Sequence, residues 1–453
     1  MMNELTKERV VRFFEEKDLV RLRAAVVAYK PEDVGELFYE LPPKYRIALF
    51  RLLPKEFAAE CFVALDTQTR RELIESFTER ELRSVTDELF LDDTVDIIEE
   101  MPANVVKKIL RSASKEDRAV INQLLGYPKD SAGSLMTPEY VRLFPGMSVF
   151  EALEHIRRVA LDSETVYTCY VTDSGRRLIG IVTAKQLLIS APDVLISDIM
   201  NTSPIFVETS LDRQSVVNLI RKYGFLALPV VDNEKRLVGI VTVDDAVDAM
   251  SEEAEEDFAK MAAITPSDEE YLKVPVSRIF LSRIPWLLLL LISSALSSLM
   301  LARFESALPA VLVLFVPMLM GTGGNCGSQS SVTVIRSLSL GTLPPRSAPR
   351  VIFKELSVGA LCGLALAVAA LLKVVVVDRF IAGNPDVSLV VAICVSLSLA
   401  LTVVIAKVIG AALPLAVKCI GLDPAVMASP FITTIVDAMS LVIYFLIARA
   451  VLL

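Results

Sequence analysis

The sequence is poor in the side chains that bind transition metals. Its 453 residues include one histidine, His155, and six cysteines, among which no CxxC pair occurs. Zinc and copper sites are built mainly from cysteine and histidine ligands. We therefore expect no such site. The cysteines are predicted to be small buried apolar side chains, and His155 is predicted to lie on a helix surface.

Carboxylates are almost absent from the second part of the chain. Residues 276–453 contain 12 Lys or Arg and 6 Asp or Glu, whereas residues 1–275 contain 34 and 49. The chain thus joins an acidic soluble half to an apolar half. Runs that reach or approach the ~20 residues needed to cross a bilayer lie near residues 284–301, 307–338, 356–377, 388–417 and 425–453. They predict an all-α transmembrane domain of five helices over residues 276–453.

The loops between these runs differ in basic residues. The loop between the second and third runs is richer in Lys and Arg than the loops after the first and third. Cytosolic loops carry the excess of basic residues. The start of the chain has charges throughout and no apolar core, so we expect no signal peptide. We predict a multi-pass protein of the cell membrane with a cytoplasmic amino-terminal half and an extracytoplasmic carboxyl terminus.

A bulky apolar residue recurs every twelve positions within residues 1–130. The positions are Leu41, Leu53, Leu65, Phe77, Leu89, Met101 and, after one gap, Leu125. Pro or Asp follows several of them, as is common at helix starts. The period predicts a superhelical array of short helices that bury their faces by stacking. A compact helical bundle with accidental spacing is the alternative.

A second repeat lies within residues 131–250. Residues 173–183 and 232–242 match at an offset of 59, each with a turn, a β-branched strand and a following helix. A Met-containing segment precedes each copy, at 135–138 and 199–202. This pair resembles tandem CBS modules. The resemblance implies two small α+β units that usually dimerise and in some proteins bind adenine nucleotides.

The CBS resemblance also implies a nucleotide site. In that family a Thr followed three residues later by Asp often contacts ribose, and Thr242 and Asp245 match this pair. The first module has Thr183 and Gln186 instead. We therefore expect at most one ATP site, in the second module.

Residues 244–275 are predicted to form an acidic helix that connects to the membrane domain. Between Asp244 and Glu270 there are 11 acidic residues and a single base, Lys260. Like charges this close on a helix repel one another. A solvated helix face is the simpler interpretation. The position beside the membrane favours a segment that binds counter-charge.

Two features of the apolar half predict a permeation path. Residues 321–327 contain four glycines, which weaken a helix by about 1 kcal/mol each and predict unwound backbone. Such backbone at membrane depth survives only beside protein or water. Asp437 lies about eleven residues into the last run, which predicts a carboxylate near the bilayer midplane. A structural ion pair with Lys407 or another intramembrane base is the alternative for Asp437.

The oxygen atoms of this region favour a hard cation. Backbone carbonyls, the Asn325 amide and the Asp437 carboxylate are oxygen ligands. Mg²⁺ keeps its waters and needs only one or two carboxylates, whereas Ca²⁺ takes more. One Asp per chain therefore suits Mg²⁺, particularly if a two-fold dimer brings two copies of Asp437 together.

The whole chain resembles the MgtE family of magnesium channels. The resemblance rests on residues 321–329, residues 423–425, residues 430–437, the CBS pair and the acidic helix. It implies a homodimer in the lipid bilayer, with a pore along the two-fold axis and hydrated Mg²⁺ bound at Asp437. It also implies that cytosolic Mg²⁺ bridges acidic groups of the soluble half and shuts the pore. We expect neither enzymatic activity nor a nucleic-acid partner.

The resemblance assigns roles to two sets of residues. The permeation residues are Asp437, Asn325, Gly323, Gly324, Thr433 and Ser429. The cytosolic Mg²⁺ sensor residues are Asp92, Asp93, Asp96, Asp212, Asp245, Asp248, Glu253, Glu256 and Asp257. Gln214, Gly224 and Ser429 depart from the family pattern, which leaves the number of sensor ions open.

Other functions account for fewer of these features. A broader divalent carrier that also admits Co²⁺ is the nearest alternative. A nucleotide-sensing receptor, with ATP on the CBS pair and spans that only anchor it, leaves Asp437 unexplained. Residues 321–328 resemble a phosphate loop but lack its lysine, so the sequence does not favour an enzyme.

Overall fold

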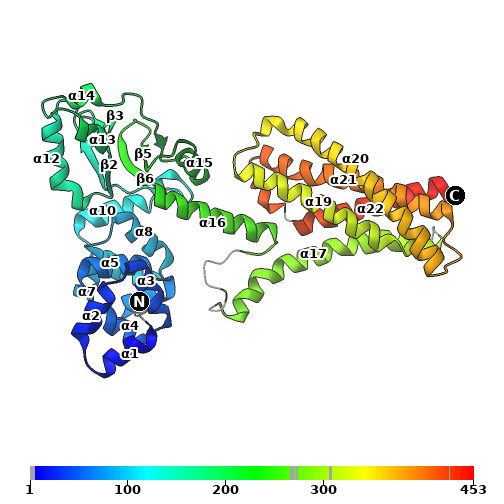
Figure 1. Cartoon of the computed structure of the whole chain (residues 1–453), viewed down its shortest axis with the longest axis horizontal. Coiled ribbons are helices and arrows are strands. Elements are labelled where there is room, and N and C mark those ends of the chain that lie inside the picture. The colour runs from blue at the N-terminus through cyan, green and yellow to red at the C-terminus, as the bar shows by residue number, and fades with distance from the viewer. Residues whose placement is uncertain (1–5, 266–270, 272–273, 306–308, 428, 453) are drawn as a thin grey trace. The chain divides into compact units, whose positions relative to one another are not determined.

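The computed structural model describes residues 6–265, 271, 274–305, 309–427 and 429–452. Its backbone contacts define two compact units, Met1–Ala249 and Met250–Leu453, which we describe separately. Figure 1 labels their helices and strands. Helix α16 (Val243–Met261) begins in the first unit and ends in the second.

The first unit starts with a stack of short helices. They are α1 (Lys7–Glu15), α2 (Leu19–Val27), α3 (Pro31–Glu40), α4 (Pro43–Phe50), α5 (Lys55–Val63), α6 (Thr67–Ser76), α7 (Glu79–Thr86), α8 (Leu91–Glu100), α9 (Ala103–Ser112) and α10 (Lys115–Leu124). From α3 to α10, each helix begins twelve residues after the one before it. Helix α3 packs on α5, α5 on α7 and α7 on α9. The predicted helical array is therefore confirmed.

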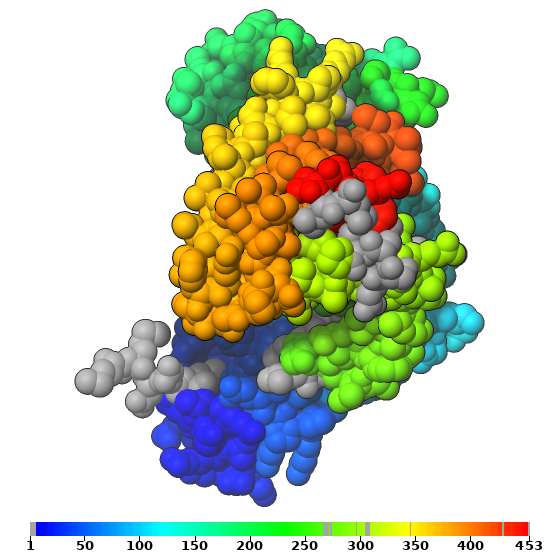
Figure 2. Space-filling view, turned by 90° about the vertical axis from the view of Figure 1, so that its right-hand side faces the viewer, coloured from blue at the N-terminus to red at the C-terminus, as the bar shows by residue number. Residues whose placement is uncertain are grey.

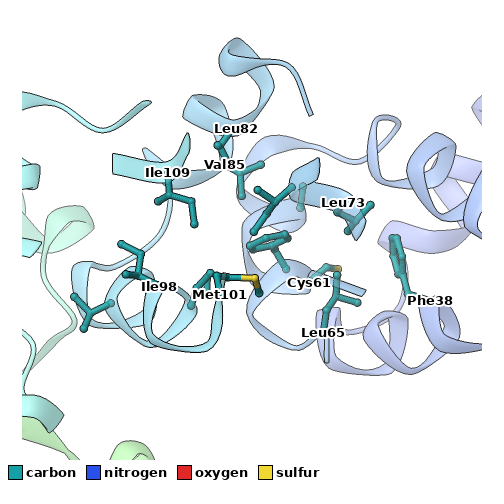
Figure 3. Close-up of a cluster of buried hydrophobic side chains, with 14 of the residues drawn as sticks. Phe38, Cys61, Leu65, Leu73, Leu82, Val85, Ile98, Met101 and Ile109 are labelled. Atoms are coloured by element: carbon teal, nitrogen blue, oxygen red, sulfur yellow. The ribbon is translucent and has the colours of Figure 1, made fainter. Parts of the chain in front are cut away.

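The residues at the twelve-residue period form the core of this stack. Leu41, Leu65 and Met101 are buried. Figure 3 shows Leu65 and Met101 in one cluster with side chains of several helices. The turns between the helices also begin the next helix: the Asp66 side chain accepts a hydrogen bond from the Thr69 backbone N–H. Such a cap satisfies a backbone donor that the helix leaves unpaired.

The rest of the first unit is a pair of matching α+β modules. The first contains α11 (Ala132–Leu135), β1 (Tyr140–Leu143), α12 (Val149–Val159), the 3₁₀ helix η1 (Ala160–Asp162), β2 (Thr165–Thr172), β3 (Leu178–Thr183) and α13 (Ala184–Ile189). The second contains α14 (Ile196–Ile199), β4 (Val207–Glu208), α15 (Arg213–Tyr223), β5 (Ala227–Val231), β6 (Leu237–Thr242) and the start of α16. In each sheet the first two strands are parallel and the last two antiparallel. The topology thus repeats with the sequence.

The two modules are joined through the segments that precede them. Thr137 pairs with Ile240 of β6, and each backbone N–H donates to the other's carbonyl, at 2.8 and 2.9 Å. Met136 covers Gly239 so closely that a methyl group built on this glycine would lie 2.7 Å from the Met136 sulfur. Gly180 has the matching contact in the first module. The repeated glycines are therefore explained by close side-chain cover.

The second unit contains the membrane helices. After α16 come α17 (Val276–Glu305), α18 (Ala310–Val313), α19 (Val316–Ser339), the 3₁₀ helix η2 (Pro345–Ser347), α20 (Ala348–Leu372), its π-helical continuation η3 (Lys373–Ile381), α21 (Leu389–Cys419), η4 (Pro424–Val426) and α22 (Ser429–Leu452). Within the described residues, five segments are long and apolar enough to cross a membrane, as predicted. Helix α21 packs against α19, α20 and α22. Figure 2 shows α20 and α21, yellow to orange, side by side.

The glycine run of α19 is helical, so the prediction of unwound backbone is wrong. Helix α19 continues without a break through residues 321–327. Its glycines instead permit close packing: a methyl group built on Gly410 of α21 would lie 2.2 Å from the Gly327 carbonyl oxygen. A methyl group on Gly323 would lie 2.8 Å from Thr402 Cγ2. Small residues let membrane helices approach closely, and here that packing outweighs the low helix propensity of glycine.

Gly410→Val should destabilise the membrane domain. The new side chain has no room beside the Gly327 carbonyl, and overpacking a tight core costs about 1–3 kcal/mol. Gly321→Ala is the matched control, because a methyl group there would meet nothing within 4 Å. Size-exclusion chromatography after heating measures the folded fraction. Equal midpoints for the two variants would contradict the close contact between α19 and α21.

Candidate functional site

Carboxylates from three parts of the first unit form an acidic cluster, which we define as Asp92, Asp93, Glu164 and Asp245. Asp92 and Asp93 lie in the first turn of α8. Glu164 lies between η1 and β2, and Asp245 lies in the first turn of α16. The helical array, the first CBS-like module and the acidic helix therefore each contribute to one site.

The cluster holds protons more tightly than ordinary carboxyl groups do. Burial is the largest cause, and the negative charge of Asp245 is the next. Together they raise the pKa of Asp92 to about 9, of Glu164 to about 8 and of Asp93 to about 6. Burial likewise raises the pKa of Asp245. Arg70 opposes the rise at Asp93. The charged form of the cluster thus lacks sufficient counter-charge.

Two oxygen atoms of the cluster lack hydrogen-bond partners. Asp92 Oδ1 and Glu164 Oε2 are both removed from solvent and unpaired in the part of the chain that the structure describes. Leaving such an atom unpaired costs about 1–3 kcal/mol. Among the described residues, no three His, Cys, Asp or Glu side chains form a direct metal cage. The cluster therefore offers a cation unpaired carboxylate oxygens rather than a full set of protein ligands.

Sequence reasoning missed two acidic residues of this region, Glu164 and Glu139. Glu139 accepts a hydrogen bond from the Leu91 backbone N–H at 2.9 Å and so caps the start of α8. Burial raises the pKa of Glu139, although that hydrogen bond opposes the rise. Neither residue belongs to a repeat or a charge run. The one sequence signal available is that each is a single acidic residue directly before a strand, Glu139 before β1 and Glu164 before β2.

The other predicted sensor residues of the first unit are Asp96, Asp248 and Asp212. Asp96 is exposed on α8. Asp248 is exposed on α16, and its charge adds to burial in raising the pKa of Asp245. Asp212 is the N-cap of α15, where it accepts a hydrogen bond from the Ser215 backbone N–H at 2.9 Å. Asp212 thus has a structural role beside any role in cation binding.

Gly224, one of the departures from the family pattern, has a structural reason. It ends α15 with a φ of +66°, and its N–H donates to the Ile220 carbonyl. This left-handed conformation costs glycine little and other residues more. An acidic side chain at this position would strain the end of the helix.

The acidic helix ends at a contact with the membrane domain. The predicted residues Glu253, Glu256 and Asp257 lie in the part of α16 that belongs to the second unit. The Lys260 ammonium lies 2.7 Å from Glu256 Oε1 and 2.7 Å from Asp423 Oδ2. Burial raises the pKa of Asp257. The single base of the acidic segment is therefore already paired.

The predicted nucleotide pair has a structural role as well. Thr242 donates a hydrogen bond to the Asp245 carboxylate, and Thr183 donates to Gln186 Oε1 at 2.9 Å. In both modules the Thr hydroxyl therefore stabilises the start of the helix that follows. Asp245 also belongs to the acidic cluster, whose charge would repel a phosphate. An ATP site in the second module stays a prediction.

In the membrane domain, Asp437 of α22 faces Gly324 of α19. A methyl group built on Gly324 would lie 3.6 Å from Asp437 Oδ1 and 3.2 Å from Thr433 Cγ2. The alternative ion pair with Lys407 is not formed in the described structure, where the Lys407 ammonium lies 3.4 Å from Ser330 Oγ. Asp437 therefore remains available to a cation.

Asp437 lies closer to the start of its helix than the sequence predicted. Residues 424–426 form the separate turn η4, and α22 begins at Ser429. Asp437 is thus about 12 Å along the helix axis rather than the predicted ~16 Å. The Ser429 side chain lies outside the described residues. Thr433 donates its hydroxyl proton to the Pro430 carbonyl at 2.8 Å, so part of its hydrogen-bonding capacity is used inside α22.

A polar stripe lies on the exposed face of α19. Its members are spaced three or four residues apart and are all exposed: Gly321, Asn325, Gln329, Thr333 and Arg336. Lipid tails cannot pair with amide and guanidinium groups, so this face needs water or another protein surface. Asn325 belongs to the stripe, whereas Gly323 and Gly324 pack inward against α21 and α22.

Known proteins resemble this chain along almost its whole length. Residues 316–447 match the MgtE family of divalent cation transporters, residues 29–130 its intracellular N domain, and residues 132–192 and 196–252 the CBS domain. The magnesium transporter MgtE of Thermus thermophilus is 38% identical over 97% of this chain and 96% of its own. That of Bacillus subtilis is 30% identical over 98% and 96%. The crystal structure of the cytosolic domain of the Mg²⁺ channel MgtE in complex with ATP shares 37% identity and a TM-score of 0.51, over 53% of this chain and 98% of that one.

Without Mg²⁺, the contribution of the acidic cluster to stability should fall as the pH rises. An unfolded carboxyl has a pKa near 4, so above about pH 4 the folded chain binds more protons than the unfolded one, and stability declines until about pH 9. Asp92→Asn should flatten this decline, and Asp193→Asn, an exposed acid, should not. Scanning calorimetry of the full chain between about pH 6 and 9 measures it. Parallel curves for wild type and Asp92→Asn would contradict the burial of Asp92.

Proposed function

Since this chain belongs to the MgtE family of divalent cation transporters, we propose that it is a channel that admits Mg²⁺ through the cell membrane and is closed by Mg²⁺ on its cytosolic side. The observation that carries the permeation part is Asp437, a carboxylate within a membrane span that faces a glycine rather than a base. The acidic cluster carries the regulatory part. The proposed activity is transport without a chemical reaction.

The surroundings of Asp437 suit an ion that keeps its water. Gly324 leaves space in front of the carboxylate, because any side chain there would approach Asp437 Oδ1. Mg²⁺ releases its waters reluctantly and is typically held by one or two carboxylates with water filling the other positions. Asn325, the next residue on α19, adds an amide on the exposed face. A single carboxylate and nearby polar groups are enough for a hydrated divalent ion.

A second copy of the chain completes this path. The polar stripe of α19 is exposed in one chain and is unsuited to lipid. A two-fold axis beside the stripe would place two stripes, and two copies of Asp437, around one water-filled passage. We therefore propose a homodimer with its pore on the two-fold axis. The basic loop between α19 and α20 then lies in the cytosol, and the carboxyl terminus lies outside.

The acidic cluster supports a negative-feedback gate. At low cytosolic Mg²⁺, the ionised forms of Asp92, Asp93, Glu164 and Asp245 lack sufficient counter-charge and repel one another. This repulsion favours separation of the parts that carry them. At high Mg²⁺, a hydrated ion between α8 and α16 neutralises the charge and holds the parts together. Because α16 continues toward the membrane domain, its position is the link from cluster to pore.

Two further ligands, Co²⁺ and ATP, can be tested with the same protein. A broader divalent transporter would carry Co²⁺ along the same path, and competition between Co²⁺ and Mg²⁺ flux distinguishes the two cases. ATP is a candidate second ligand of the CBS pair, because the similar cytosolic domain has been crystallised with ATP. A receptor that only senses nucleotide would leave Asp437 without a role.

Asp437→Ala should abolish Mg²⁺ uptake into liposomes that hold the purified protein. The substitution removes the carboxylate that offsets the cost of bringing a divalent cation to membrane depth. A Mg²⁺-sensitive dye inside the liposomes measures uptake. Asp386→Asn, an exposed acid in the loop before α21, is the control and should transport normally. Uptake at the wild-type rate by Asp437→Ala would remove this residue from the path.

Neutralising the acidic helix should leave the channel open at high internal Mg²⁺. The variant replaces Asp245, Asp248, Glu253 and Glu256 by their amides. This removes the carboxylates that Mg²⁺ would bridge, so Mg²⁺ can no longer hold the parts together. Flux is measured with and without Mg²⁺ on the side of the soluble domains. Closure that matches wild type would count against the gate.

A charge-matched control separates this effect from a general change of net charge. It carries the same number of amide substitutions at exposed acids of the CBS modules: Asp162, Asp193, Asp198 and Glu234. This control should still close at high Mg²⁺.

A further inference from the structure

Three membrane helices share a polar bridge, with two buried members and one half-buried member, that the proposed pore does not use. Lys407 of α21 is 5% exposed, and its ammonium lies 3.4 Å from Ser330 Oγ of α19. Ser330 is 2% exposed and donates a hydrogen bond to Glu355 Oε2 of α20 at 2.5 Å. We call Lys407, Ser330 and Glu355 the polar bridge.

Joining membrane helices through charged side chains is energetically unfavourable. Lys407 and Glu355 both lie within membrane spans, where a charge is costly and apolar residues would pack the helices as well. What the hydrogen bonds add is a single allowed arrangement, because a shift of one helix would separate Ser330 from Lys407 or from Glu355. The polar bridge therefore favours one rotation and one register of the three helices.

Glycines bring the bridge together. Gly359 lies one turn after Glu355, and a methyl group built on it would be 3.6 Å from Lys407 Cβ. Gly410 lies one turn after Lys407 and meets the carbonyl of Gly327. Helix α21 thus lies in close backbone contact with α20 on one side and with α19 on the other. Lys407 stands between these two contacts.

The same turns of α19 carry the bridge and the polar stripe. A hollow of about 670 Å³ is lined by Gln329 and Thr333 of the stripe together with Ser330, Glu355 and Lys407. Ser330 is buried, whereas its neighbour Gln329 is exposed. A rotation of α19 about its axis would therefore disturb both faces at once.

We propose that Lys407 and Glu355 are positioning residues of the pore, which act through Ser330 to fix the rotation of α19 and so determine the selectivity for Mg²⁺. This inference rests on the proposed permeation path. Ser330 lies six residues after Gly324, less than two turns away. The bridge therefore sets where Gly324 and Asn325 stand relative to Asp437, and hence the width of the passage for a hydrated ion.

The experiment compares ion fluxes through variants of the full-length protein in liposomes. Lys407→Met and Ser330→Ala each break the bridge, and Lys418→Met, an exposed lysine of the same helix, is the matched control. We expect the ratio of Mg²⁺ to Ca²⁺ flux to fall roughly two- to thirty-fold in the first two variants, and to stay at the wild-type value in the control. Lys407→Arg should retain most of the ratio.

The flux ratio is measured because misfolding lowers the Mg²⁺ and Ca²⁺ fluxes in the same proportion and leaves their ratio unchanged. An unchanged ratio in Lys407→Met and Ser330→Ala would overturn the inference while leaving the proposed function intact. Absence of Mg²⁺ flux in wild type would instead overturn the proposed function.

Measurements of melting temperature test the polar bridge independently of any transport assay. Lys407→Met removes the base that Ser330 links to Glu355, so adding Glu355→Gln should recover part of the loss in melting temperature. Strict additivity of the two substitutions would show that the residues do not act as a pair.

Discussion

Carboxylates held away from water without a basic partner are the constraint on which this molecule depends. A buried charge that lacks compensation destabilises its surroundings, and the fold responds by holding protons, binding a cation or moving apart. The acidic cluster shows the first response in the raised pKa values of Asp92 and Glu164. Asp437 faces Gly324 and forms no ion pair with Lys407 within the described residues. In both units, a cation from solution would supply the counter-charge that stabilises the site.

Close helix packing is what makes such sites specific in the membrane domain. Glycines of α19, α20 and α21 bring backbones into contact, so side chains at the same level have few alternative positions. Gly324 serves two purposes: it lets α22 approach α19, and it leaves space before the Asp437 carboxylate. Gly359 and Gly410 do the same for Lys407. The small residues therefore determine the positions of the charged side chains as well as the closeness of helix packing.

Periodic features of this chain were predictable from the sequence, and contacts between distant residues were not. The twelve-residue period and the 59-residue repeat encode local structure, and the helix starts and paired sheets follow them. The glycine run shows where propensity fails, because a monomeric helix scale omits the partner helices that stabilise α19. Asp245 was found from the local charge run, and Asp92 was assigned only through the family resemblance. Glu164 was missed, because only the fold brings a lone acid from the first module to them.

The distribution of bases explains why a mobile cation, rather than a fixed one, suits the regulatory site. Lys260 is the single base between Asp244 and Glu270, and its ammonium contacts both Glu256 and Asp423. It is thus used at the membrane end of the acidic helix. A lysine beside Asp245 would neutralise the cluster permanently. The charge of the cluster would then not depend on the cytosolic Mg²⁺ concentration. Because Arg70 opposes the raised pKa of Asp93 but not that of Asp92 or Glu164, most of the cluster stays uncompensated. A divalent ion neutralises two carboxylates at once and leaves when its concentration falls, so the missing bases are what allow the cluster to report on Mg²⁺.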